Sequence, residues 1–542
     1  MILMVPVDKR PWPSLGGQVC DWIEQNLCFG PGDLRGQPAK IDAEKQALIW
    51  RMYEIYPRKH VSAGRRRFRR VGISLPKGTA KTELAAWIAA AELHPSAPVR
   101  CIGWTKSGEP IGGPVNDPYI PMVATTEEQS DELAYGALRS ILEESLIGKD
   151  FDIGLERIAR LSGGGKAESI ANSPNSADGA RTTFQVFDET HRHVMARFKN
   201  AHKTMMMNIP KRKLADAWSL EITTAPKPGE GSVAEDTMRY AEQIADGRIK
   251  DASLFFFHRQ SSDHHDLKTR AGARAAVIEA SGASAAWRNI DAIVDMWADP
   301  TTDRTYWERV YCNRLVRSSA QAFDVIAWRK CAKPSTVNPG ELITLGFDGA
   351  LFRDSTGLVG TRVSDGYQWL IQGWERPVDL PPGQSWQVPE EEVDAAVRTA
   401  FEQFEVWRLY ADPPYWQSWI AQWRKEFGEE RVIEWFTTRT RQMANAIEGY
   451  DTAIKTGTLS HAGQLEMERH IANACRREVS PAQGAESALY VITKDRPDSP
   501  NKIDYAMAGV LSWEARTDAV ASGEDGQNPY LIHGVRRLGE TE

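Results

Sequence analysis

The stretch SLPKGTAKTE, residues 74–83, contains the residue types that bind nucleotide phosphates. In a phosphate-binding loop of the form GxxxxGK[ST], backbone amides surround the phosphates, the lysine reaches the outer ones and the hydroxyl binds Mg²⁺. Aligned on Lys81 and Thr82, this chain has Leu75 and Ala80 at the two glycine positions. If position 80 needs a positive φ, alanine there costs about 1 to 2 kcal/mol.

Other features of this segment favour nucleotide binding. Gly78 supplies backbone freedom in mid-loop, and Lys77 adds a second positive charge. The expected helix that follows has an apolar face, so it would pack onto a sheet and direct its N-terminus at the phosphates. The candidate nucleotide contacts of the loop are Lys77, Gly78, Thr79, Ala80, Lys81 and Thr82.

Two adjacent acids end the β-rich run TTFQVFDE, residues 182–189, about a hundred residues downstream. An ATPase with a phosphate loop needs one carboxylate to hold Mg²⁺ through water and another to polarise the attacking water. Asp188 suits the first role and Glu189 the second. Adjacent acids after a strand are common by chance, but their order and spacing after the loop predict ATP hydrolysis.

Three aspartates in the second half of the chain lie at the ends of short apolar runs. Asp348 follows LITLGF, Asp412 follows WRLYA, and Asp504 lies at the start of a helical pattern. On two adjacent strands and a helix, such carboxylates could converge on two divalent metals that activate water at a phosphodiester. Asp354 competes for a place in this cluster, and acids at strand ends also serve as caps.

The elements that would position these residues fall into two groups. Up to residue 330, short β-rich runs alternate with helical patterns such as 126–147, which predicts a mainly parallel sheet with helices on both faces. After the proline-containing linker 331–341, the run 342–375 predicts two or three antiparallel strands. The expected domains are 1–330 with an N-terminal extension 1–40, then 342–517, then a polar tail 518–542.

Length and composition limit the classes of protein to which the chain could belong. A chain of 542 residues with 42% apolar and 26% charged residues is expected to be soluble and to form at least two domains. Its longest helical apolar run, 84–93, is too short for a bilayer, and residues 1–12 do not resemble a signal peptide. The six cysteines form no CxxC pair, which is typical of reduced thiols in the cytoplasm.

The net charge of −7 means that any contact with nucleic acid must come from local patches. The run RKHVSAGRRRFRR, residues 58–70, carries seven Lys or Arg and no acid. It fits a solvated basic loop and a contact with phosphate backbone equally well.

Three histidine or glycine motifs favour simpler interpretations. HRH at 191–193 and DHH at 263–265 lack a third metal ligand at suitable spacing, so we expect solvated imidazoles there. SGGGK at 162–166 contains the letters of a phosphate loop, but a hairpin turn is the better interpretation.

Taken in order, these motifs resemble the large terminase subunit of tailed bacteriophages, which packages DNA and cuts it. Four further stretches carry the resemblance across roughly residues 40–515: IDAEKQALIWRMYEIY (41–56), ITTA (222–225), LSHAGQLEMERHIANA (459–474) and NKIDYAMAGVLSWEA (501–515). The phosphate loop departs from the family, because many relatives have glycine where this chain has Ala80.

The resemblance implies further roles for individual residues. Gln46 would contact adenine, and Thr223 and Thr224 would sense the γ-phosphate. The second domain would be ribonuclease-H-like, with a metal-binding triad formed by Asp348, Asp412 and Asp504. An arginine from a neighbouring subunit would reach the transition state, with Arg181 or one in the run 65–70 as candidates.

The function implied is a viral packaging motor that uses ATP and Mg²⁺ at one site and two Mg²⁺ or Mn²⁺ at the other. The implied partners are double-stranded DNA, a small terminase subunit, the portal protein and further copies of the chain in a ring, with no membrane. The implied location is the cytoplasm of an infected bacterium. Two alternatives stay open: a cellular helicase-like or repair ATPase whose second domain binds nucleic acid, and a docking subunit that does not hydrolyse ATP.

Overall fold

In the computed structural model the chain forms two compact units. The first contains 1–227 and 231–316, and the second contains 228–230 and 317–542. The structure describes all residues except 9–10, 125–133, 172–178, 317–320, 353, 378–379, 381–384, 480–488, 495–498, 500 and 525–542. No helix in the described part of the chain is long and apolar enough to cross a membrane.

The first unit is built on a nine-stranded sheet in the order β1-β11-β2-β10-β9-β5-β8-β7-β6. The six strands from β11 to β8 are parallel, while β1 at one end and β7 and β6 at the other are antiparallel. The strands are β1 (Ile2–Val5), β2 (Arg70–Ser74), β5 (Tyr119–Ala124), β6 (Phe151–Ile153), β7 (Arg157–Arg160), β8 (Lys166–Ala171), β9 (Phe184–Asp188), β10 (Trp218–Thr223) and β11 (Leu254–Arg259).

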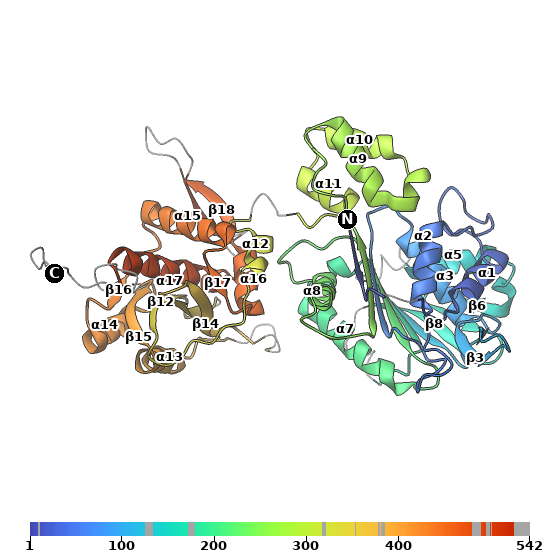
Figure 1. The fold of residues 1–542 in the computed structure, drawn as a ribbon, viewed down its shortest axis with the longest axis horizontal. Coiled ribbons are helices and arrows are strands. Elements are labelled where there is room, and N and C mark those ends of the chain that lie inside the picture. The colour runs from blue at the N-terminus through green and yellow to red at the C-terminus, as the bar shows by residue number, and fades with distance from the viewer. Residues whose placement is uncertain are drawn as a thin grey trace, which may run out of the picture. The chain divides into compact units, whose positions relative to one another are not determined.

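Helices cover both faces of this sheet, as Figure 1 shows, with α1, α2, α3 and α5 on one side and α7 and α8 on the other. Every residue of β9 and β10 is therefore buried, including the polar Gln185, Ser219 and Glu221. The helices are α1 (Gly16–Asn26), α2 (Ala43–Met52), α3 (Lys81–Leu93), α5 (Ala134–Glu144), α7 (Ala196–Asn208) and α8 (Val233–Ala245).

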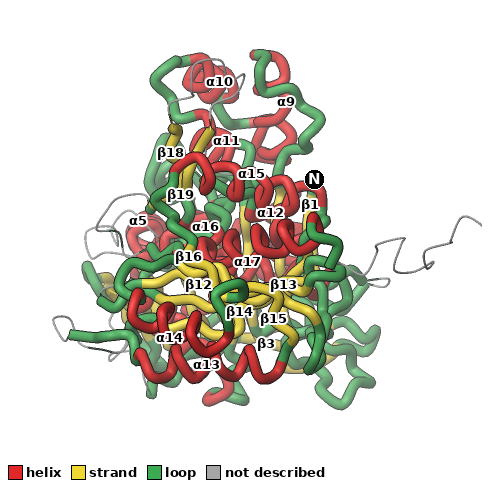
Figure 2. The backbone as a smooth tube through the Cα atoms, turned by 90° about the vertical axis from the view of Figure 1, so that its left-hand side faces the viewer, coloured by secondary structure: helices red, strands yellow, loops and turns green. Residues whose placement is uncertain are grey.

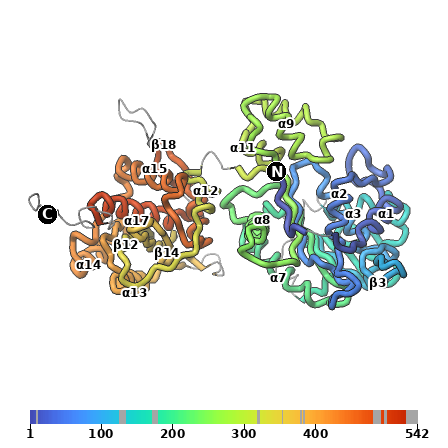
Figure 3. Tube along the Cα trace, viewed as in Figure 1, coloured from blue at the N-terminus to red at the C-terminus, as the bar shows by residue number. Residues whose placement is uncertain are grey.

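Helices α9 (Arg270–Ser281), α10 (Ile290–Ala298) and α11 (Arg304–Tyr311) form a separate group, visible in Figure 3 in yellow-green. They have their own small core, which includes Val277, Val294 and Trp307. The β-rich run 97–104 does not join the central sheet: β3 (Arg100–Trp104) pairs with β4 (Pro110–Gly113) in a separate antiparallel ribbon.

The second unit contains a six-stranded sheet in the order β16-β15-β12-β13-β14-β17. The three successive strands β12, β13 and β14 are antiparallel, and β15 then pairs parallel to β12. The strands are β12 (Leu342–Gly349), β13 (Thr356–Arg362), β14 (Tyr367–Trp374), β15 (Glu405–Ala411), β16 (Val432–Glu434) and β17 (Ser460–His461). The expected fold class, a mainly parallel phosphate-loop domain followed by a ribonuclease-H-like domain, is confirmed.

This second sheet also lies between helices, with α13 and α14 on one face and α15, α16 and α17 on the other (Figure 2). Glycines Gly346 and Gly357 let α17 approach closely, since an added Cβ would lie 2.0 Å from Ala508 O and 2.6 Å from the Tyr505 ring, respectively. The helices are α12 (Val325–Lys330), α13 (Glu390–Gln403), α14 (Gln417–Phe427), α15 (Thr440–Thr456), α16 (Leu465–Asn473) and α17 (Asp504–Ala521); a separate ribbon is formed by β18 (Cys475–Val479) and β19 (Leu489–Thr493).

The two units divide at 316/317, ahead of the linker segment 331–341. Helix α12 lies in the second unit because the ring of Trp328 stacks on His461 at 3.9 Å and contacts Tyr450. At the other end, residues 518–521 belong to helix α17 and not to the polar tail. The rest of that tail, from residue 525, lies outside the described residues.

Candidate functional sites

The segment from Leu75 to Ala80 joins strand β2 to helix α3, as the phosphate-loop interpretation requires. Ala80 has φ 57° and ψ 40°, in the left-handed region, and Gly78 has φ 76°. Alanine at position 80 therefore carries the cost of about 1 to 2 kcal/mol. No side chain caps the N-terminus of α3, so its first amides remain available to bind an anion.

Lys81 lies inside the loop. Its Nζ donates hydrogen bonds to the carbonyl oxygens of Leu75 at 3.0 Å and Pro76 at 2.9 Å, and lies 3.5 Å from Thr224 Oγ1. Burial lowers the pKa of the Lys81 ammonium, while the nearby carboxylates of Glu189 and Asp188 act in the opposite direction. Thr79 stabilises the loop by donating to Pro76 O at 2.8 Å.

Asp188, the last residue of β9, faces the first turn of α3. Its Oδ2 accepts hydrogen bonds from Thr82 Oγ1 at 3.5 Å and from Ala134 N at 3.1 Å, while its buried Oδ1 has no hydrogen-bond partner among the described residues. Burial, reinforced by the charge of Glu189, raises the pKa of Asp188 to about 7. A hydroxyl beside a carboxylate with a free oxygen is a donor set that suits Mg²⁺.

Glu189 follows in the left-handed region, with φ 51° and ψ 46°. Its Oε2 lies 3.2 Å from Nδ1 of His191, and the same Nδ1 lies 3.1 Å from Thr223 Oγ1. The Thr223 hydroxyl donates its proton to Thr224 O at 2.9 Å, so its oxygen is the acceptor in the contact with His191. We therefore assign the imidazole proton to Nδ1. Burial lowers the pKa of His191 to about 4, so the ring is neutral at pH 7.

The expectation that His191 is solvated is wrong. The residue connects the candidate catalytic glutamate to the first threonine of the ITTA motif, and His193 beside it is fully buried. Sequence spacing could not reveal this, because Thr223 reaches the site from another strand. Thr223 and Thr224 themselves lie at the end of β10, on the same sheet edge as Asp188.

Arg288 is a further residue that the sequence did not single out. Its Nη2 donates a hydrogen bond to the backbone carbonyl of Lys77, and Gly78 also lies close to the guanidinium. Burial lowers the pKa of Arg288 to about 10. Gln46, the expected adenine contact, lies on α2, where its Nε2 donates to Ile41 O at 3.2 Å.

Arg181, the candidate trans-acting arginine, precedes β9 at the end opposite Asp188. It therefore cannot reach the nucleotide site of its own chain, and its role toward a neighbouring subunit stays a prediction.

The basic run 58–70 divides into structural and exposed residues. The guanidinium of Arg66 is buried 4.0 Å from the Trp218 ring centroid. That of Arg67 pairs with Asp8 at 2.6 Å and Glu54 at 2.7 Å. Arg69 is exposed. The run is therefore in part a set of buried arginines, which neither interpretation of the sequence anticipated.

The three aspartates of the second unit gather at one end of its sheet. Asp348 lies near the end of β12, Asp412 directly follows β15, and Asp504 begins α17. The amide of Asp412 donates to Phe347 O at 3.0 Å, and the carboxyls of Asp348 and Asp412 are close enough to share a hydrogen bond. Thr437 holds Asp412 through its hydroxyl at 2.7 Å and its amide at 3.1 Å.

Crowding of these carboxylates opposes their ionisation. The pKa of Asp348 lies well above its usual value because the group is desolvated and faces Asp504 and Asp412. Burial and the charge of Asp354 raise the pKa of Asp504 to about 7. Carboxylates held together at this cost are typical of a cation site.

Asp354 lies beside the cluster but is engaged elsewhere. It pairs with Lys494, and with Lys502 at 3.1 Å, and these cations hold the pKa of Asp354 below its ordinary value. The negative charge of Asp354 is thus balanced by two lysine side chains.

The carboxylate oxygens of the three aspartates are not all close enough together to surround one metal ion. Among the described residues, only His264, His265 and Glu279 bring three ligand atoms within 4.8 Å of one another. The ions of a two-metal site lie about 3.5–4 Å apart, so a carboxylate that binds one ion need not lie close to a carboxylate that binds the other. Glu279 supplies the third ligand that the DHH motif lacked, but it already accepts hydrogen bonds from Ser262 and His265.

The SGGGK motif is a hairpin turn, as expected. It joins the antiparallel strands β7 and β8, and its three glycines all have positive φ.

No family model matches the chain. It is 26% identical over 494 residues to the "Gene 13 protein" of Mycobacterium phage L5, covering 82% of this chain and 79% of the relative. The same protein of Mycobacterium phage D29 matches equally.

Solved structures of large terminases also resemble the chain. That of bacteriophage HK97 has 15% identity and a TM-score of 0.48, with coverage of 93% of this chain and 100% of the other. A large terminase from a thermophilic bacteriophage, solved in complex with ADP, has 11% identity, a TM-score of 0.31 and coverage of 76% and 87%.

Proposed function

We propose that this chain is the large terminase subunit of a tailed bacteriophage, an ATP-driven motor for double-stranded DNA that also cuts its substrate. One observation carries the proposal: a single chain combines a phosphate loop facing an Asp–Glu pair with a separate ribonuclease-H-like unit bearing three crowded aspartates. The sequence relatives in two mycobacteriophages support a viral origin.

In the first unit, the phosphate loop and the N-terminus of α3 would bind the phosphates of ATP, with Lys81 and Lys77 supplying positive charge. Thr82 and Asp188 would hold Mg²⁺, which would draw charge from the transferring phosphoryl group. Glu189 would orient the attacking water and accept its proton, held in place by His191. Thr223 and Thr224 would respond to the γ-phosphate, and Gln46 would contact the base.

In the second unit, Asp348, Asp412 and Asp504 would hold two Mg²⁺ or Mn²⁺ ions. Bound there, the ions would supply an activated water and stabilise the leaving oxygen of a phosphodiester. Thr437 and Ser355 orient two of the carboxylates by donating to Asp412 and Asp504. The expected partners are the small terminase subunit, the portal protein and further copies of this chain in a ring, within the cytoplasm of the infected bacterium.

The two activities are tested separately with the full chain. Phosphate release is measured for wild type, Lys81→Ala and Ala80→Gly, and plasmid nicking is measured with Mg²⁺ or Mn²⁺ for wild type and Asp348→Ala. We expect Lys81→Ala to lose phosphate release alone and Asp348→Ala to lose nicking alone. No turnover by wild type or either loop variant would favour a non-hydrolysing docking subunit, and no nicking by wild type with either metal would favour an ATPase whose second domain only binds nucleic acid.

A further inference from the structure

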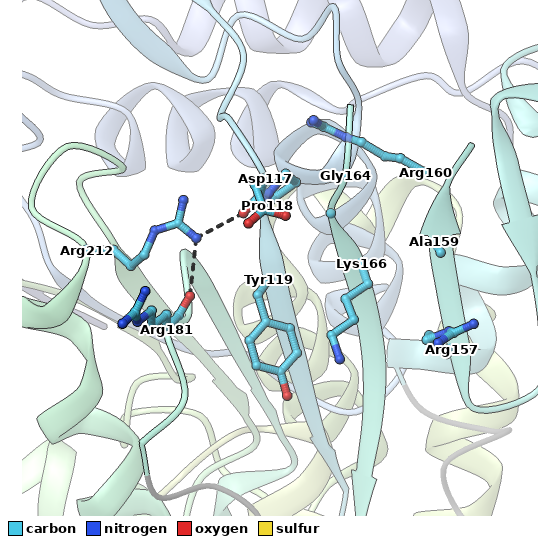
Figure 4. Close-up of a pocket in the computed structure, with 11 residues that line it drawn as sticks. Asp117, Pro118, Tyr119, Arg157, Ala159, Arg160, Gly164, Lys166, Arg181 and Arg212 are labelled. Atoms are coloured by element: carbon cyan, nitrogen blue, oxygen red, sulfur yellow. Dashed lines mark hydrogen bonds between the residues drawn. The ribbon is translucent and has the colours of Figure 1, made fainter. Parts of the chain in front are cut away.

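Two cavities in the first unit share the side chain of Arg212, and most of the charged residues in their walls are basic. The larger, about 680 Å³, has Arg157, Arg160, Lys166 and Arg181 in its wall and Asp117 as its acid (Figure 4). The smaller, about 380 Å³, is lined on its basic side by Lys213 and by arginines of the run 65–69. We call six of these residues the basic strip: Arg69, Lys213, Arg212, Arg181, Lys166 and Arg157.

The basic strip follows one edge of the central sheet. Arg69 directly precedes β2, Lys213 precedes β10, Arg181 precedes β9 and Lys166 begins β8. These four strands are parallel, so Arg69, Lys213, Arg181 and Lys166 lie along their N-terminal edge. Arg157, on the antiparallel strand β7, pairs with Glu168, two residues into β8 from that edge. From β2 to β7 the sheet order gives five inter-strand steps, through β10, β9, β5 and β8, and the strip spans about 24 Å at about 4.8 Å per step.

The nucleotide residues lie at the opposite edge. Asp188 ends β9, and the phosphate loop follows the end of β2. Five-residue strands at about 3.3 Å per residue separate the two edges by roughly 17 Å. The cations of the strip therefore cannot neutralise the phosphates of a nucleotide bound to the same chain, and their charge is available to another polyanion.

Several cations of the strip have no partner among the residues that the structure describes. Arg69, Arg157, Arg181 and Lys213 are exposed, and their side chains make no hydrogen bond or ion pair with any residue that the structure describes. Two of the nearby acids are engaged, since Asp216 accepts from the amide of Arg66 and Glu168 pairs with Lys166, while Asp117 is the one acid in the wall of the larger cavity. The strip thus keeps an excess of positive charge in a chain whose net charge is −7.

The centre of the strip is held rigidly. Arg212 donates hydrogen bonds to the carbonyl oxygens of Asn116 at 2.9 Å, Asp117 at 2.9 Å and Arg181 at 3.4 Å. Figure 4 shows Arg212 and Arg181 on one side of Tyr119 and Lys166 and Arg157 on the other. Because these bonds fix the backbone on which Arg181 is mounted, the exposed guanidinium starts from a defined position, which lowers the entropic cost of binding.

We propose that the basic strip binds the phosphate backbone of duplex DNA. A single nucleotide is too short to occupy it, whereas about 24 Å corresponds to about seven base pairs of B-form duplex at about 3.4 Å each. Contacts of this type position DNA without reading its sequence. The inference rests on the proposed function, because it names the surface of the first unit that would hold the substrate of the motor.

The test measures binding of the full chain to a fluorescent 30-base-pair duplex at several salt concentrations, in EDTA and without nucleotide. The strip variant combines Arg69→Gln, Arg157→Gln, Arg181→Gln and Lys213→Gln. The control variant removes four exposed cations elsewhere in the same unit: Lys106→Gln, Arg248→Gln, Lys268→Gln and Arg274→Gln. Arg157→Glu alone serves as a second, minimal strip variant, and thermal melting confirms that each variant is folded.

We expect the slope of log Kobs against log salt to become shallower by about 2 to 4 in the strip variant, because each lost phosphate contact contributes about 0.9. The control variant should keep the wild-type slope. Equal slopes for the strip variant and wild type, or equal losses in strip and control variants, would overturn the proposal. Since the readout needs neither hydrolysis nor cleavage, its failure is distinct from failure of the ATPase and nicking assays.

Discussion

Nδ1 of His191 lies 3.2 Å from Oε2 of Glu189, and this contact fixes the side chain that we assign to water activation. A neutral imidazole is the appropriate donor, since a positively charged ring would stabilise the carboxylate and make Glu189 a weaker base toward water. The same nitrogen contacts Thr223 Oγ1, so a displacement of Thr223 at the end of β10 would move His191 and, through it, the side chain of Glu189.

The first prediction concerns His191 as a positioning residue. His191→Ala should lower kcat for ATP by about 10- to 100-fold while KM changes less than about threefold, because the loss affects orientation and not nucleotide binding. His191→Gln, whose amide can still donate, should recover part of the rate. A rise in KM as large as the fall in kcat, or equal rates for His191→Ala and His191→Gln, would indicate that His191 only stabilises the fold.

Ala80 provides a second prediction. Ala80→Gly should raise the free energy of unfolding by up to about 1 kcal/mol, because relief of the left-handed strain exceeds the added entropy of the unfolded chain. Ala80→Val should destabilise by more than about 1 kcal/mol. Denaturant unfolding checks both, with Ala85→Gly inside α3 as a control that should destabilise by about 1 kcal/mol. Stabilisation by valine would contradict the observed φ.

A third prediction follows from the crowded aspartates. Asp348→Asn should abolish nicking yet raise the melting temperature in EDTA, since it removes one of the desolvated, mutually repelling groups. The gain should be on the order of 1 kcal/mol. Mn²⁺ should raise the melting temperature of wild type more than that of the variant. Asp354→Asn should instead destabilise, because Lys494 and Lys502 would lose their partner.

The fourth prediction uses Glu514 in helix α17. Burial and the charge of Asp518 raise the pKa of Glu514 from its ordinary value to about 7. The native state therefore binds the proton more tightly than the unfolded chain, and stability should fall as pH rises from about 4.5 to about 7. Glu514→Gln should remove this loss, stabilising by about 1 kcal/mol at pH 8 after allowance for partial exposure, with little effect at pH 4.5.

Melting temperatures at both pH values check this prediction. Glu448→Gln, at an exposed position on α15, is the control and should leave the pH profile unchanged. A stabilisation of Glu514→Gln that is the same at both pH values would contradict the assignment.

Much of the fold could be predicted from patterns that act locally. The strands β2, β9 and β10 contain apolar residues that the covered sheet buries, and the acids Asp188 and Glu189 stand at a strand end where parallel sheets place their ligands. Strand β11, with the apolar run LFFFHR, takes its place beside β2 only through a long crossover from β10, which no local pattern specifies.

Residues that depend on distant partners could not be predicted. Arg288 meets the phosphate loop only after α9 and α10 have folded as a group, and His191 meets Thr223 only once β9 and β10 are paired. Arg66 and Arg67 looked like free charges in a basic run, yet their partners Trp218 and Asp8 lie far from them in the chain. Burial of a charge is decided by tertiary contacts, which a local window does not contain.

The parallel strands of the first unit connect the sheet edge that carries the phosphate loop and Asp188 to the edge that carries the basic strip, and each strand has a fixed length. A strand held on both sides by backbone hydrogen bonds can neither lengthen nor shorten without losing its register. Energy released at one edge therefore cannot move the other edge along the strand axis. In the motor that we propose, a stroke would therefore come from the whole sheet moving as one body, or from helices that pivot around it.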